Sequence, residues 1–244
     1  MTRTAASTGL GPLLALCGAL VWTSCGDGGD SAPTITITGS IADASTFAPL
    51  EDVRICLYEH HSTPCAHTDA DGSYSMDVPA SSELIFEVTR DGYWPYLTNF
   101  LAPGIDYEFP GPLYIFSEAE VLAGAASLGE TIDAERGHLW VTVSDARTVD
   151  GASGLPGAAL DLDPGAGGIL FFVDDDQSLS KTRTTTSSQG MASYMNAAPG
   201  DWILQVSHPD LECKPEHAFA GPQANSFRVH LTAGYTTSIF VYCD

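Results

Sequence analysis

Six cysteines are the residues whose types and spacing most directly suggest chemistry. Cys56, Cys65, Cys213 and Cys243 form an even set in the body of the chain, which in an exported protein predicts two disulfides. A hairpin turning at residues 60–61 would bring Cys56 beside Cys65, so we expect that pair and, by consequence, Cys213 with Cys243. A zinc site using these thiols and nearby histidines is the alternative, but zinc-binding cysteines usually come as C-x-x-C pairs.

Cys25 follows a different kind of segment. Arg3 precedes an apolar run over residues 10–22, two small residues follow at 23–24, and a polar, glycine-rich stretch covers 26–30. This order is typical of a secretory signal peptide, and about 13 apolar residues are too few for a helix that spans a bilayer, which needs roughly 20.

The residues leading into Cys25 resemble the lipobox of bacterial lipoproteins. The resemblance implies cleavage before Cys25 and acylation of that cysteine, with the membrane as a partner through the lipid anchor. Trp22 stands where the family prefers Leu. The alternative is an ordinary signal peptide cut near Ser24, which would leave a soluble secreted protein.

Acidic residues gather in two loops that could hold calcium. Asp174, Asp175 and Asp176 directly follow an apolar strand, and a hard cation would relieve the repulsion of their carboxylates, although a solvated loop screens it cheaply. Asp69-Ala70-Asp71-Gly72 resembles the start of an EF-hand loop, but Ala80 stands where the last ligand should be Glu. We therefore expect a structural turn at residues 69–72 and keep calcium as an alternative at residues 174–176.

Aromatic residues suggest a glycan-binding platform at Tyr93, Trp94 and Tyr96. Exposed rings at such spacing could stack on sugars. The interpretation that we favour is that the same rings pack between strands at a domain edge, and the platform is the alternative.

The sequence contains no signature of catalysis. It has no G-x-S-x-G elbow, and its histidines are scattered among predicted strands and loops. Glu83 and Glu87 share one face of a predicted strand, but a sequence does not show whether they face a cleft. We expect a protein that is not an enzyme, with no catalytic residues and no cofactor.

The charge of the chain is strongly negative. It has 31 acidic against 9 basic residues, a net charge of −22. Such a surface repels phosphate backbones, so we expect no nucleic-acid partner. Because 44% of residues are hydrophobic, the composition favours packed domains over a disordered acidic tail.

Short alternating segments predict an all-β fold in two halves. Residues 34–41 place isoleucines on one face and threonines on the other, as in a half-buried strand. The expected strands of the first half then follow at 53–58, 63–68, 73–78 and 83–90, and those of the second at 139–143, 157–162, 169–173, 182–186, 191–196, 202–206, 227–231 and 236–242. Ser117 and Glu120 predict a capping box at the start of one helix, which Gly129 would end.

The landmarks of the first half resemble those of the carboxypeptidase regulatory-like domain. They read Gly39-Ser40-Ile41-Ala42-Asp43, Pro49-Leu50-Glu51-Asp52-Val53, Thr68-Asp69-Ala70-Asp71-Gly72 and Asp91-Gly92-Tyr93. The match covers residue 34 to about 110, with Asp52 in place of a usual glycine, and the second half is similar but looser. The resemblance implies a transthyretin-like, Greek-key antiparallel sandwich with a noncatalytic accessory role.

The sequence thus predicts a lipoprotein signal peptide at 1–24, a tether at 25–33 and sandwiches at 34–115 and 137–244, joined by a helical linker at 116–136. We expect a lipid-anchored protein of a Gram-negative outer membrane that serves a structural or protein-binding role. A carbohydrate-binding module is the first alternative, and a calcium-binding surface domain is the second. The partner would be an envelope protein or a glycan.

Overall fold

The structure is a computed structural model that describes residues 33–60 and 62–244. Cys25 and the predicted signal peptide lie outside these residues. The described chain belongs to one compact unit, and it is almost entirely β. Within it, no helix has both the length and the apolar character needed to cross a membrane.

The first half is a sandwich of two small layers. One layer has the order β4-β1-β7, with β8 also paired to β1, and the other contains β6-β5-β2-β3. Ile37 and Val78 are fully buried between the layers, as the alternation at residues 34–41 predicts. The strands are β1 (Thr34–Asp43), β2 (Arg54–Leu57), β3 (Ala66–His67), β4 (Ser73–Pro79), β5 (Glu83–Thr89), β6 (Tyr96–Leu101), β7 (Tyr107–Glu108) and β8 (Leu113–Ile115).

The second half repeats the two-layer arrangement. The order β10-β14-β17-β16 forms one layer, and β12-β11-β13-β9-β18, with β15 on β18, forms the other. Leu139, Phe172 and Leu204 are fully buried in its core. The elements are β9 (Gly137–Ser144), a 3-10 turn (Thr148–Asp150), β10 (Ala159–Leu162), β11 (Ile169–Val173), β12 (Leu179–Ser180), β13 (Met191–Ala197), β14 (Gly200–Ser207), β15 (Cys213–His217), β16 (Phe219–Ala220), β17 (Ser226–Leu231) and β18 (Thr236–Cys243).

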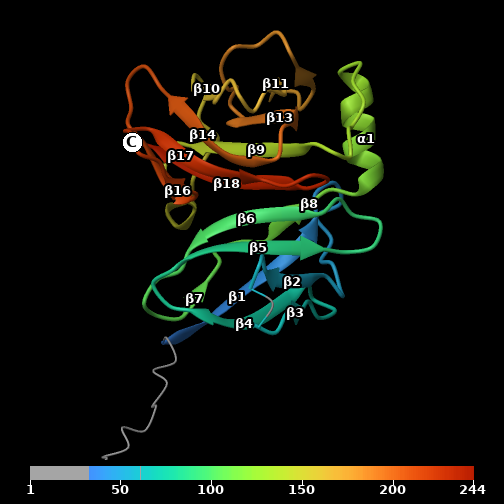
Figure 1. The fold of residues 1–244 in the computed structure, drawn as a ribbon, viewed down its shortest axis with the longest axis vertical. Helices are drawn as coiled ribbons and strands as arrows, with labels where there is room; N and C mark the ends of the chain where they lie inside the picture. Colours follow the sequence, from blue (N-terminus) through green and yellow to red (C-terminus); the bar gives the residue numbers. More distant parts are fainter. Residues whose placement is uncertain (1–32, 61) are drawn as a thin grey trace, which may run out of the picture. The chain divides into compact units, whose positions relative to one another are not determined.

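The two halves share a sheet, which the prediction of two tandem sandwiches does not include. β18 pairs in parallel with β9 along seven residues and, on its other edge, with β6 through residues 236–238 (Figure 1). A ten-stranded sheet therefore runs from one half into the other. The link depends on backbone hydrogen bonds far apart in sequence, which side-chain periodicity does not reveal.

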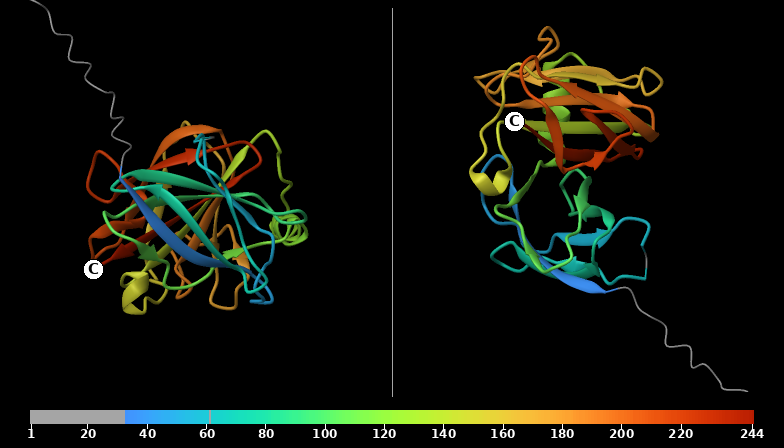
Figure 2. Two further views of the ribbon diagram at one scale, coloured as in Figure 1. Left: turned by 90° about the horizontal axis from the view of Figure 1, so that it is seen from below. Right: turned by 90° about the vertical axis from the view of Figure 1, so that its left-hand side faces the viewer.

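The predicted helix is present as α1 (Glu118–Ser127). Ser117 Oγ accepts from the backbone of Glu120, and the Glu120 carboxylate accepts from the backbone of Ser117, which confirms the capping box. Gly129, at φ +74°, follows the helix end. The helix lies across the strand direction (Figure 1) and is seen nearly end-on in the left view of Figure 2.

The Asp69–Gly72 segment is a structural turn, as expected. Asp69 Oδ1 accepts from the backbone N–H groups of Asp71 and Ser73, each at 3.0 Å. Gly72 has φ +75°, and a Cβ there would lie 2.6 Å from the Ile41 carbonyl oxygen. The strand expected at 182–186 is wrong, because those residues form bends, and Thr186 instead bonds through its side chain to the Leu155 carbonyl.

Candidate functional site

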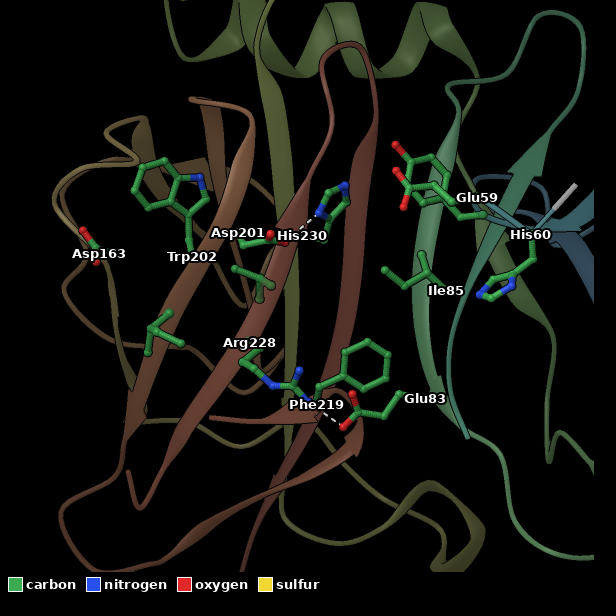
Figure 3. A pocket seen from close by; sticks show the side chains of 13 residues that line it. Glu59, His60, Glu83, Ile85, Asp163, Asp201, Trp202, Phe219, Arg228 and His230 are labelled. Atoms are coloured by element: carbon green, nitrogen blue, oxygen red, sulfur yellow. Dashed lines mark hydrogen bonds and ion pairs between the residues drawn. The ribbon is translucent and has the colours of Figure 1, made fainter. Parts of the chain in front are cut away.

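A groove of about 600 Å³, lined by both apolar and charged side chains, lies between the two halves. We call it the inter-sheet groove and define it by Tyr58, Glu83, Trp202, Phe219, Arg228 and His230. Figure 3 shows Glu83 and Ile85 on one wall and Arg228 and His230 on the other. Asp163 and Trp202 lie farther from Glu83 and Ile85 than Arg228 and His230 do.

Strand alternation places these side chains. β5 buries its even-numbered residues in the first core and turns Glu83, Ile85 and Glu87 to the opposite face. β17 buries its odd-numbered residues in the second core and turns Arg228 and His230 outward. The groove is therefore bounded by the outer faces of two strands that belong to different cores.

Polar contacts join the two halves at this groove and beside it. Arg228 Nη2 donates to Glu83 Oε1 at 2.5 Å, and the guanidinium also lies 5.5 Å from the centroid of the Phe219 ring. The Tyr235 hydroxyl donates to Glu87 Oε1 at 2.7 Å. Burial, with the neighbouring Glu87 carboxylate, raises the pKa of Tyr235 to about 12, so this hydroxyl keeps its proton at neutral pH.

Asp201 and His230 form a pair on the outer face of β14 and β17. They are directly opposite in the antiparallel register, and His230 Nδ1 lies 2.7 Å from Asp201 Oδ1. An Asp–His pair could serve a nucleophile, but the residues lining the groove include no serine, threonine or cysteine. The pair presents hydrogen-bonding atoms to the groove.

Three aromatic rings accompany the carboxylates of the groove. Tyr58 packs 5.5 Å from the His230 ring, and its hydroxyl lies 3.0 Å from Thr232 Oγ1. Trp202 is held by a 2.8 Å hydrogen bond from Nε1 to the Ala198 carbonyl. With Phe219, these rings give the groove apolar surfaces fixed beside polar acceptors.

Burial of Trp94 and Tyr96 contradicts the alternative of a glycan platform at these residues. Trp94 is 9% exposed and Tyr96 is 4% exposed, because both pack where the halves meet, with Trp94 against His138. Tyr93 is half-buried, and its hydroxyl donates to Asp43 Oδ2 at 2.8 Å. The packing interpretation of this cluster describes it better.

Asp43 was not singled out from the sequence, although it organises this corner. Its carboxylate accepts from the Thr46 backbone and from the hydroxyls of Ser45, Thr46 and Tyr93. The Thr46 backbone hydrogen bond, with those hydroxyls, holds the pKa of Asp43 well below its usual range. Its role is to fix the loop after β1.

The three aspartates proposed for calcium bind separate protein partners. Asp174 accepts from Arg183 at 2.6 Å, Asp175 accepts from Ser188, and Asp176 accepts from Ser178. Their carboxylates do not converge, and no group of three or more metal-binding side chains is found across 33–60 and 62–244. This geometry gives the calcium hypothesis no support.

Both expected disulfides are confirmed. Cys56 bonds to Cys65 with an S–S distance of 2.10 Å, and Cys213 bonds to Cys243 at 2.14 Å. The second bond links directly opposed residues of β15 and β18. Lipidation at Cys25 stays a prediction, since that residue lies outside the described chain.

Sequence reasoning missed most of the groove. It noted that Glu83 and Glu87 share a face, and the structure places both on the outer face of β5. Arg228 and His230 alternate with buried apolar residues in a predicted strand, a pattern that marks them as outward-facing. What the sequence lacks is any sign that these two faces oppose each other.

No family model matches the chain, and no curated protein matches its sequence. Solved structures with weak similarity include the Bacillus anthracis TIE protein, at 13% identity and TM-score 0.28, where the match covers 86% of this chain but 34% of that one. GBS52, the minor pilin of Streptococcus agalactiae, gives 14% identity and TM-score 0.29, covering 87% and 95%. Shaft pilin SpaA from Lactobacillus rhamnosus GG gives 13% identity and a TM-score of 0.25, and the match covers 88% of this chain and 98% of that one.

Proposed function

We propose that this chain is an exported, noncatalytic binding protein of the bacterial envelope whose inter-sheet groove takes a neutral glycan. One observation carries the proposal: fixed aromatic rings and hydrogen-bonding carboxylates line the same groove. Sugars offer both complements, because their C–H faces stack on rings and their hydroxyls donate to carboxylates.

Charge favours a neutral ligand. The chain carries a net charge of −22, and Asp163, Asp201 and Glu83 all line the groove. The positive Arg228 is already paired with Glu83, so an anionic ligand would meet uncompensated repulsion. A neutral polyhydroxylated ligand avoids that cost.

The proposed location is the outer membrane, with a lipid anchor at Cys25. The predicted signal peptide supports export, and so do two disulfides, which persist in oxidising compartments. The resemblance of the first half to carboxypeptidase regulatory-like domains supports an accessory role. Mass spectrometry of the membrane fraction tests the anchor, with a Cys25→Ser variant as the control that should lose it and leave the membrane.

A glycan array tests the binding function. We expect the purified protein to bind a subset of neutral glycans, with the signal lost in Tyr58→Ala and reduced at least tenfold in Asp201→Asn. Phe47→Ala removes an exposed ring outside the groove and should bind as the unsubstituted protein does. Failure of the protein to bind any neutral glycan, or equal binding by all variants, would overturn the proposal.

A protein partner is the second candidate, favoured by the edge strand β4. Its seven residues pair with β1 alone among the described strands, which leaves the other edge for strand addition. A Ser75→Pro substitution on this edge would abolish such binding and leave the groove intact.

A further inference from the structure

A second cavity, of about 490 Å³, lies beneath α1. Its floor is the face of β9, β11 and β13 that points away from the second core, with Trp140, Phe171 and Met195 among its lining residues. Val121 and Ala125 line it from the helix. We call this cavity the helix groove.

The sheet beneath this groove is apolar on both faces. In β11, Phe172 points into the second core while its neighbour Phe171 points to the helix groove. Sheets with two apolar faces are normally covered on both, yet α1 presents small residues here, including Gly124 and Ala125. At the rim, Phe47 is 69% exposed and Tyr114 is 42% exposed, with ring centroids 5.5 Å apart. The groove is thus an apolar space with room inside it and an aromatic rim.

His138 is a buried polar side chain in the lining of this groove, which also includes Glu120, Gln177, Gln189, Ser193 and Thr236. It lines the groove, is 4% exposed, and its Nδ1 accepts from the Asn196 backbone N–H at 3.3 Å. Burial lowers the pKa of His138 to about 4, so the ring is neutral at pH 7 and carries its proton on Nε2. That Nε2 has no hydrogen-bond partner among the described residues, and neither does Nε1 of the adjacent Trp94.

An unpaired buried donor is costly, and a ligand acceptor would remove the cost. We propose that the helix groove binds a neutral, largely apolar small molecule whose carbonyl oxygen accepts a hydrogen bond from His138 Nε2. The volume falls in the range of small-molecule sites, about 300–1,000 Å³. A free carboxylate fits less well than a ketone or ester, because Glu120 also lines the groove.

The test compares 2-decanone with decane, which share a chain and differ in the acceptor. Binding is followed by tryptophan fluorescence, since Trp140 lines the groove. We expect the ratio of ketone to alkane affinity to fall about five- to tenfold in His138→Phe relative to the unsubstituted protein. Comparing this ratio between the two proteins cancels the different aqueous solubilities of the two probes.

Two controls separate this site from others. Leu122→Ala alters an exposed position on α1 and should leave both affinities unchanged, and Asp201→Asn in the inter-sheet groove should do the same. Absence of ketone binding overturns the proposal. It is also overturned by an affinity ratio that His138→Phe does not change, the result expected if water satisfies Nε2.

Discussion

The buried, neutral His138 predicts a loss of stability in mild acid. Its pKa is about 4 in the folded protein, against an ordinary 6.5, and burial is the main cause, opposed by the Asp133 carboxylate. Below pH 6.5 the His138 side chain binds a proton in the unfolded chain, whereas in the folded chain it binds one only near pH 4. The free energy of unfolding therefore carries no penalty from His138 above pH 6.5, and it decreases as the pH drops from 6.5 towards 4. A shift of this size corresponds to about 3 kcal/mol.

Urea unfolding between pH 7.5 and pH 4 measures this loss. Other groups titrate in the same window, including His217, whose pKa is also lowered by burial. Comparing the protein with His138→Phe isolates one residue, and we expect the variant to lose about 3 kcal/mol less over the window. His60→Gln changes an exposed histidine and should retain the original slope. Equal losses in the protein and in His138→Phe would refute the reasoning.

Three further predictions concern stability. Asn99→Leu should raise the free energy of unfolding by about 1–3 kcal/mol, because both polar atoms of this 1%-exposed amide lack partners in the described chain; a decrease in urea unfolding would contradict this. Gly190→Ala should lower the free energy of unfolding by about 2–4 kcal/mol, measured by thermal unfolding, because φ is +66° and the new methyl would lie 2.1 Å from a carbonyl oxygen. The control Gly151→Ala, at φ +80° in open space, should lower it by only about 1–2 kcal/mol. Replacing Cys213 and Cys243 by Ala should cost about 3–4 kcal/mol from the 30-residue separation, and an unchanged unfolding midpoint would argue against it.

The sequence predicted features that depend on local pattern. Alternation at residues 34–41 defined β1, and the capping box at Ser117 located α1 within the predicted linker. The disulfides followed from an even count and a hairpin. For the strand, the helix start and the first disulfide, the interactions that produce the feature lie between residues close in the sequence.

The missed features depend on distant partners. Residues 213–217 contain Pro215 and three charged or titratable side chains, so nothing in their pattern indicates β15, which forms through pairing with β18. Packing of Trp94 at a domain edge was the favoured interpretation, but its partner His138 comes from the other half and was not predicted. The inter-sheet groove was hidden for the same reason, since its walls meet only after both halves have folded.

The placement of β18 has a consequence for biogenesis. It follows in the chain every strand that it pairs with, and it completes the sheet of the second half while extending that of the first. During synthesis the pairing of β18 with β6 and β9 cannot form until residues 236–243 have left the ribosome. Such an order places closure of the shared sheet late in folding, because its last contacts join residues far apart in the chain.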